Sequence, residues 1–365
     1  MTKKDTAIHV TLLVHASFAA FEWGRVLIDL FRVHAAKAKY TLQIVYTIKD
    51  IRYRGSPVVV LGVDSIWIKD VLDSLKPFSD KIVLLNGMTY ASYESVNYIS
   101  ADQQTAVKKC IDLLNTCGRT RPAFFGVQKN DTSDQIKALS FSERFSSDDV
   151  YQIEDSVRGC CDQLLDRLEQ YDSVICANDI MAVYLLARCR SLKIDIPGRL
   201  YLIGNGNLWL STHVTPSLTT VSHNADATVR MALQICKNIC EYEDIAPVNI
   251  SFGGHIIRRE STGTDTDNKD SLLYRRGSCF DADYRCMSSE LSQIVTLDSV
   301  FSSCSKEKTD ILRLVGKCAS IAEISELVYL SQDTVAYHLK NLYRQLGIHS
   351  KKELADIINL YGIRF

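Results

Sequence analysis

Short apolar runs alternate with longer helical segments through about the first 263 residues, and this alternation limits the possible fold more than any other feature. Runs rich in Val, Ile and Leu that are bounded by Gly, Asp or Asn are typical of strands. The strand candidates are Ile8 to Val14, Leu42 to Tyr46, Pro57 to Leu61, Lys81 to Leu85, Ala123 to Gly126, Ser173 to Ala177 and Arg199 to Gly204. The helix candidates are Trp23 to Lys37, Ile66 to Leu75, Gln103 to Thr116, Val157 to Glu169, Ile180 to Leu192 and Ala225 to Glu241. Alternating strands and crossover helices form parallel sheets covered on both faces, and the number of strands predicts two α/β lobes.

The composition is that of a globular protein. A chain of 365 residues with 46% hydrophobic and 23% charged residues is long enough for two or three domains. Its formal net charge of -1 gives no sign of a polyanionic partner. No apolar run approaches the roughly 20 residues that span a bilayer, so we expect a cytoplasmic protein with no membrane contact.

Catalytic and metal-binding patterns are missing from the sequence. The 12 cysteines include no C-x-x-C pair, and most lie within apolar patterns, which predicts buried free thiols. No G-x-S-x-G, P-loop or dinucleotide fingerprint occurs either. We therefore predict no catalytic residues, no metal and no cofactor, and a protein that is not an enzyme.

A second pattern lies near the C-terminus, from Ile321 to Leu346. Two groups of apolar residues at helical spacing are separated by a short break, which predicts two amphipathic helices. The first group is Ile321, Ile324, Leu327 and Val328, and the second is Val335, Leu339, Leu342 and Leu346. Ser331 lies in the break and can cap the second helix. This arrangement predicts a helix-turn-helix, in which the second helix enters the DNA major groove.

The face of the second helix opposite its apolar residues has side chains that suit DNA contact. Lys340 and Arg344 can reach phosphates or guanine, Asn341 can pair with adenine, and Tyr337 can stack or meet a thymine methyl. Gln332 and Ala336 lie on the same face. The alternative is an ordinary pair of core helices with a solvated polar face.

The segment from Cys304 to the end resembles the LuxR-type DNA-binding domain. The residues that carry the resemblance are EIS, LSQDTVAYHLKNLYRQLGIHSKKELA and the apolar positions between them, over about 60 residues. The resemblance implies that Ser331, Thr334 and Lys351 also lie at the DNA. Ala336 and Gln345 stand where basic residues are common in that family, so we expect weaker and less salt-sensitive binding.

The first 262 residues resemble the ligand-sensing domain of the lactose/galactose repressor family, which is shaped like periplasmic sugar-binding proteins. The match is strongest from Ser173 to Val221, where ANDIMA, IGNGN and PSLTTV fall at the family's positions, and RREST closes it at Arg258 to Thr262. The family's N-terminal helix-turn-helix has no counterpart here, so we expect DNA binding at the C-terminal end. The resemblance implies a two-lobed sensor of type I with parallel sheets, followed by a small all-α domain.

Ligands of such proteins bind between the lobes, at the carboxyl ends of the strands. Aromatic rings with amide and carboxylate groups there would suit a sugar or another small polar ring. The candidates are His15, Ser17, Phe18, Trp23, Trp67, Asp102, Asn178, Asn205, Asn207 and Trp209. Asp179 fits a helix N-cap better than a ligand contact, and Phe18 has a core position as its alternative. Gly206 stands where the family often has a carboxylate, which argues against the usual sugar pose.

We therefore predict a DNA-binding transcription regulator with a sensor over residues 1–262, a linker with a helix over 263–302 and a helix-turn-helix domain over 303–365. Lobe 1 is expected at about 1–102 and 222–253, and lobe 2 at about 103–221 and 254–262. The expected partners are double-stranded DNA, a small-molecule effector such as a sugar, and a second copy of the chain. Two alternatives stay open: a sensor fold that binds no ligand and serves as a dimerisation or protein-interaction platform, and C-terminal helices that only dimerise.

Overall fold

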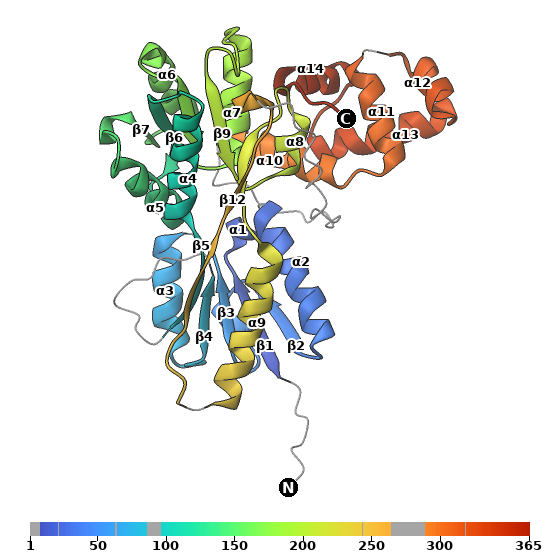
Figure 1. The fold of residues 1–365 in the computed structure, drawn as a ribbon. Helices are drawn as coiled ribbons and strands as arrows, with labels where there is room; N and C mark the ends of the chain where they lie inside the picture. Colours follow the sequence, from blue (N-terminus) through green and yellow to red (C-terminus); the bar gives the residue numbers. More distant parts are fainter. Residues whose placement is uncertain are drawn as a thin grey trace.

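The computed structural model describes residues 8–20, 22–62, 64–85, 96–242, 244–263, 289–317 and 319–365, with residues 20, 22 and 23 described by their backbone only. These residues form two α/β lobes stacked end to end and a helical domain beside the second lobe (Figure 1). The predicted architecture, two α/β lobes with parallel sheets followed by an all-α domain, is confirmed.

Lobe 1 is a parallel six-stranded sheet in the order β11-β5-β4-β3-β1-β2. Its elements are β1 (His9–Val14), α1 (Ala16–Ala20), α2 (Glu22–Lys37), β2 (Thr41–Val45), β3 (Val58–Leu61), α3 (Ser65–Leu75), β4 (Ile82–Leu85), β5 (Asn97–Asp102), α9 (Ala225–Glu241) and β11 (Asn249–Gly253). Helices α2 and α9 cover one face of the sheet, and α3 covers the other. The central strand β3 reads VVVL and is buried throughout, because a strand covered on both faces has no polar side.

Lobe 2 is a second six-stranded sheet in the order β12-β10-β9-β8-β6-β7, parallel except for β12 against β10. Its elements are α4 (Gln103–Thr116), β6 (Pro122–Gln128), α5 (Thr132–Ser142), β7 (Val150–Ile153), α6 (Val157–Asp166), β8 (Ser173–Cys176), α7 (Asp179–Ser191), β9 (Tyr201–Asn205), α8 (Trp209–His213), β10 (Thr219–Ser222) and β12 (His255–Ile257). Helices α4 and α5 pack on one face, and α6 and α7 on the other. The chain crosses between the lobes after β5, after β10 and after β11.

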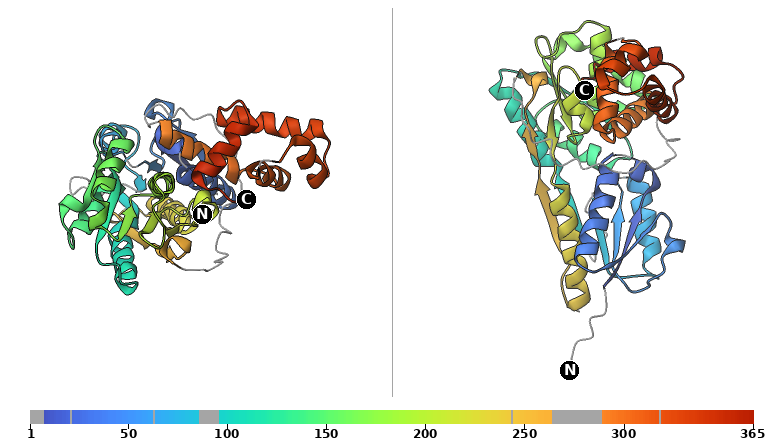
Figure 2. Two further views of the ribbon diagram at one scale, coloured as in Figure 1. Left: turned by 90° about the horizontal axis from the view of Figure 1, so that it is seen from above. Right: turned by 90° about the vertical axis from the view of Figure 1, so that its right-hand side faces the viewer.

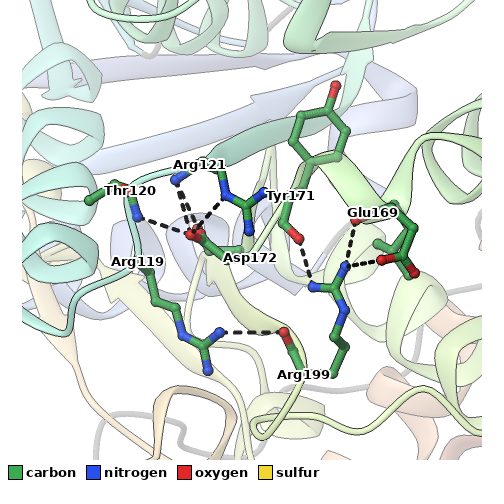
Figure 3. Close-up of polar contacts among 9 residues, drawn as sticks. Arg119, Thr120, Arg121, Glu169, Tyr171, Asp172 and Arg199 are labelled. Atoms are coloured by element: carbon green, nitrogen blue, oxygen red, sulfur yellow. Dashed lines mark hydrogen bonds and ion pairs between the residues drawn. The ribbon is translucent and has the colours of Figure 1, made fainter.

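Polar contacts fix the amino ends of the lobe 2 strands (Figure 3). The Asp172 carboxylate accepts hydrogen bonds from the backbone N–H groups of Thr120 at 3.1 Å and Arg121 at 3.2 Å. The Arg199 guanidinium donates to the carbonyl of Tyr171 at 2.7 Å. These bonds hold the amino ends of β6, β8 and β9 together, so the residues at this end of lobe 2 stabilise the sheet.

The C-terminal domain consists of α10 (Ser289–Ser302), α11 (Lys306–Gly316), α12 (Ile321–Val328), α13 (Gln332–Leu346) and α14 (Lys351–Tyr361). The helix predicted at about 283–300 corresponds to α10, and residues 283–288 lie outside the described residues. Buried side chains of this domain continue into those of lobe 2 as one hydrophobic core. In the side view of Figure 2 the domain lies beside lobe 2, with lobe 1 below both.

The strands and helices predicted from apolar patterns are all present, with ends that shift by up to three residues. No apolar pattern predicted β5, β7, β10, β11 and β12, or α1, α5, α8, α11 and α14. Cysteines of the described part of the chain are free, and those in helix and strand interiors are buried. Burial raises the pKa of the Cys110 thiol to about 12, so that thiol is neutral at pH 7.

Candidate ligand and DNA interfaces

The carboxyl ends of β3 and β6 bring the two lobes into contact. The backbone N–H of Ser65 donates to the carbonyl of Asn130 at 3.1 Å, and Asp64 pairs with Asp131 as an antiparallel bridge. Both aspartates are also N-caps: Asp64 accepts from the N–H of Trp67 at 2.7 Å, and Asp131 accepts from that of Asp134 at 2.9 Å. Two helix N-termini therefore meet where the lobes touch, and the lobes are closed at this point.

On lobe 1, His15 and Trp67 form an aromatic pair beside this contact. Their ring centroids lie 4.7 Å apart, and the Ser17 hydroxyl lies 2.9 Å from Nδ1 of His15. A side chain at Gly62 would come within 2.8 Å of the Trp67 ring and 3.1 Å of His15, so the pair packs closely against the end of β3. Burial lowers the pKa of His15 and the Asp64 carboxylate opposes this only in part, so the ring is neutral at pH 7.

Two other predicted residues of lobe 1 do not add to this pair. Phe18 is 5% exposed and packs in the lobe 1 core, which is the alternative that its sequence position left open. The side chain of Trp23 lies outside the described residues.

On lobe 2, Asn178 and Asp179 follow the end of β8. Asn178 is the N-cap of α7, because its Oδ1 accepts from the N–H of Met181 at 3.0 Å. The Nδ2 group of this amide takes no part in the cap. Asp179, which the sequence favoured as the cap, is instead the first residue of the helix and is fully buried. It accepts hydrogen bonds from the hydroxyls of Ser211 and Thr220, both at 2.6 Å, so it fixes the lobe interior.

A buried ion pair lies next to Asp131 and was not predicted. Lys137 and Asp134 are 4% and 2% exposed, with Nζ 2.8 Å from the carboxylate, and Nζ also donates to the carbonyl of Ala177. Burial and the neighbouring Asp134 carboxylate raise the pKa of Asp131 to about 7, and the Lys137 ammonium opposes that shift. The Asp-Thr-Ser-Asp sequence at 131–134 is a capping pattern that could have revealed α5 and this cluster.

Hydrogen bonds connect the segments that cross between the lobes. Nε2 of His223 lies 3.0 Å from Oδ1 of Asn205, and the Asn205 amide donates to Gln103 at 3.3 Å. Lys109 donates to the carbonyl of Gly254 at 2.7 Å. Burial lowers the pKa of His223 to about 4. Asn205 lies at the carboxyl end of β9, as predicted, and contacts two segments of the hinge between the lobes.

Three predicted ligand residues have structural partners. The Asp102 carboxylate caps α4 through the N–H of Thr105 at 2.9 Å. Asn207 is 5% exposed and accepts from Arg259 at 2.7 Å. Trp209 stacks on His213 at 3.6 Å and packs against the C-terminal domain. The sequence signal could not separate an aromatic residue at a domain boundary from one at a ligand.

The helix-turn-helix has the predicted internal packing. Val335, Leu339 and Leu342 of α13 are at most 2% exposed. Ser331 caps the helix by accepting from the N–H of Thr334 at 3.1 Å, and Ser320 and Glu323 form a capping box on α12. Leu327 and Ile321 differ from their prediction, because they are 62% and 37% exposed rather than part of the apolar face.

The outer face of α13 is accessible. Its exposed residues are Gln332, Asp333, Tyr337, Lys340 and Arg344, and Thr334, Ala336 and Asn341 are half-buried beside them. Arg344 donates to the side-chain oxygen Oδ1 of Asn341 at 3.2 Å, so the two side chains are held together on this surface. Lys351, at the start of α14, donates to the carbonyl of Ala319 at 2.6 Å, which brings its ammonium group to the entry of α12.

Two family descriptions match the two parts of the chain. Residues 111–262 match the periplasmic binding protein-like domain, and residues 302–358 match the luxR family of bacterial regulatory proteins. The chain therefore combines a periplasmic binding protein-like domain with a C-terminal segment that matches the luxR family of bacterial regulatory proteins.

The chain is similar to the HTH-type transcriptional regulator GalR of Escherichia coli, at 28% identity over 102 residues, which are 28% of this chain and 30% of GalR. GalR of Salmonella typhimurium is 28% identical over 105 residues, or 29% of this chain and 31% of that protein. The chain thus matches less than a third of the length of these curated relatives.

Solved structures share the two-lobed fold. The complex of the transcriptional regulator CelR with cellobiose has a TM-score of 0.60 at 15% identity, covering 72% of this chain and 86% of that one. The lac repressor dimer bound to operator and the anti-inducer ONPF has a TM-score of 0.58 at 11% identity, covering 71% and 95%. Among the described residues, no helix is both long and apolar enough to cross a membrane.

Proposed function

We propose that this chain is a transcription regulator that binds a small polar molecule between its lobes and uses that binding to control the C-terminal helix-turn-helix. One observation carries the proposal: His15 and Trp67 of lobe 1 and the polar groups around Asp131 of lobe 2 come together at strand ends of a chain that also has an exposed recognition helix. The proposal involves no catalytic reaction, and it includes a cytoplasmic location because the DNA lies there.

The ligand that best suits this junction is an uncharged molecule with hydroxyl groups, such as a sugar. A neutral His15 beside Trp67 offers an aromatic surface for a ring, while the Nδ2 group of Asn178 is available to bond a hydroxyl. The Lys137 charge is already paired with Asp134, so it does not call for a charged ligand. The cellobiose found with CelR supports this class of ligand.

Thermal unfolding of the full chain with cellobiose, glucose, galactose and a nucleoside tests the ligand proposal. A ligand at 100 times its dissociation constant should add about 2.7 kcal/mol to the free energy of unfolding. Trp67→Ala should abolish the shift, whereas Tyr242→Ala, at an exposed position just after α9, should keep it. If none of these compounds or a wider metabolite screen shifts the transition, the sensor fold is a platform that needs no ligand.

For DNA, we propose that a homodimer places two α13 helices on an inverted repeat, as two-fold symmetric helix-turn-helix proteins do. The lac repressor structure is a dimer on its operator, which supports this arrangement. Selection of duplexes from a random pool by the full chain, with its mass measured by light scattering, tests both parts. A monomer, or a pool without enrichment, would contradict the proposal.

A further inference from the structure

The DNA-binding domain and lobe 2 share one hydrophobic core. Buried residues of α10, such as Ile294 and Leu297, belong to the same cluster as Leu185 of α7 and Leu339 of α13. Helix α10 contacts α7 and α8 on one side and α13 on the other, and α14 also packs on α7. Two domains that share a continuous core separate only by exposing it to water.

Aromatic residues close the boundary between the two domains. Trp209 of α8 lies 6.0 Å from Phe301 of α10 and 5.9 Å from Phe365, measured between ring centroids, and Phe301 and Phe365 meet edge to face at 5.1 Å. The backbone N–H of Arg364 donates to the His213 carbonyl at 2.6 Å.

A buried carboxylate forms a hydrogen bond between α10 and lobe 2. Asp298 of α10 is 1% exposed and accepts a hydrogen bond from the backbone N–H of Leu210 at 2.8 Å. A second polar contact joins Tyr361 of α14 to Gln293 of α10 at 3.0 Å. Because buried polar contacts require one geometry, α10 is held in a single orientation between lobe 2 and the DNA-binding helices.

Lobe 1 also reaches α10. Arg25 of α2 donates from Nη1 to the Ser299 hydroxyl at 2.5 Å, and Ser299 is 8% exposed. Asp298, one residue before, is the group that holds Leu210 of lobe 2. Helix α10 therefore touches both lobes on adjacent residues and packs on α13 at the same time.

We propose that lobe 2, α10 and the DNA-binding domain move as one body. We also propose that the Arg25–Ser299 contact couples the position of lobe 1 relative to this body to the affinity for DNA. This inference rests on the proposed function and adds its regulation. When the lobes close, Arg25 engages α10 and restricts it. When they open, that contact breaks, and the body that carries α13 is no longer held to lobe 1 through α10. Arg25 is thus a positioning residue.

A reversible lock between the lobes tests this coupling in the full chain. Ser65 and Asn130 face each other across the lobe contact, so Ser65→Cys with Asn130→Cys suits a disulfide. Hydrogen exchange is measured for the oxidised and reduced forms of the same protein. We expect exchange in α10 to slow at least about threefold on oxidation, with α10 and α14 changing together. The unsubstituted chain under the same oxidant controls for the exposed Cys240.

Two arginine variants of the double-cysteine protein test whether Arg25 causes the difference in α10 exchange. Arg25→Ala should abolish the difference between oxidised and reduced α10, whereas Arg32→Ala, in the same helix but paired with Asp29, should preserve it. Equal exchange in the two forms, or a difference that survives Arg25→Ala, overturns the proposal. So does exchange in α14 that rises while α10 stays protected, because the two would then not be one body.

DNA binding gives the second readout. With duplexes selected by the unsubstituted chain, the oxidised and reduced lock should differ in affinity by at least about threefold, and Arg25→Ala should remove that difference. If no duplex is selected, the proposed function fails, while the exchange measurements still decide whether lobe 1 acts on α10. If duplexes are bound equally by both forms, the coupling is wrong and the proposed function stands.

Discussion

Nε2 of His223 lies 3.0 Å from Oδ1 of Asn205, which ties a segment that crosses between the lobes to the carboxyl end of β9. The Asn205 side chain also donates a hydrogen bond to Gln103, at the start of another crossing segment. The hinge thus depends on a neutral imidazole that donates from Nε2, because burial lowers the pKa of His223 to about 4. Protonation of this ring would place a charge in a buried hinge beside the Lys137 ammonium, which also lowers its pKa.

This geometry predicts a loss of stability in mild acid. A histidine in the unfolded chain has a pKa of about 6.5, above the folded value, so below that pH the unfolded chain binds a proton that the folded chain does not. The contribution of neutral His223 is therefore complete above about pH 6.5 and is lost as the pH falls toward 4, by about 3 kcal/mol in all. Urea unfolding between pH 7 and 4.5 should show a steeper decline for the unsubstituted chain than for His223→Gln. His349→Gln, at an exposed position of the C-terminal domain, should follow the unsubstituted chain.

The exposed cations of α13 predict a measurable electrostatic contribution to DNA binding. Lys340→Ala and Arg344→Ala should each weaken binding and, if the side chain contacts a phosphate, lower the salt-dependence slope by about 1. Lys237→Ala, on α9 of lobe 1, removes the same charge far from α13 and should have no effect. Titration of a selected duplex at several salt concentrations measures the slope. Unchanged affinity in both variants would favour helices that only dimerise.

Ser331 has a structural role as an N-cap and a predicted role as a DNA contact. Comparison with Ser320, which has only the capping role, separates the two. Ser331 and Ser320 are both N-caps of helices in the same domain. Replacement of either by alanine should lower the free energy of unfolding by about 1 kcal/mol. An additional loss of DNA affinity in Ser331→Ala, beyond that of Ser320→Ala, would indicate direct contact with DNA. Equal affinities at equal stability would limit Ser331 to capping.

The sequence predicted those parts of the fold whose stability comes from their own residues. The run from Val58 to Leu61 is apolar because both faces of its strand are buried, and Ser331 caps the helix that immediately follows it. Strand β10 was missed because it reads TTVS, and its threonines are buried only through partners elsewhere in the chain. Thr220 donates to Asp179, and Thr219 lies 2.7 Å from the hydroxyl of Thr262.

The candidate site shows the same division. Helix α5 escaped prediction because the buried Lys137 interrupts its apolar face, and only the fold supplies Ala177 as its partner. Trp209 is an aromatic residue that follows a strand end, as a ligand residue would. Its packing partner Phe365 lies at the other end of the sequence, so the sequence alone could not reveal the contact. His15 and Trp67 could be placed from sequence because each follows a strand that the apolar pattern defines.

Tyr337 provides the sharpest test of sequence readout by α13. It is 64% exposed on the outer face, and Ala336 beside it supplies no cation, so we expect specificity to depend on Tyr337 together with Lys340 and Asn341. Tyr337→Ala should reduce the affinity ratio between a selected and a scrambled duplex by roughly tenfold, which corresponds to about 1.4 kcal/mol. Because the ring is already in water, the free energy of unfolding should hardly change. Competition binding at fixed salt measures the ratio, and Tyr329→Ala, at a residue 94% exposed in the turn before α13, serves as the matched aromatic control. A ratio that falls equally in both variants would assign the effect to the aromatic surface of the domain and not to base contact by α13.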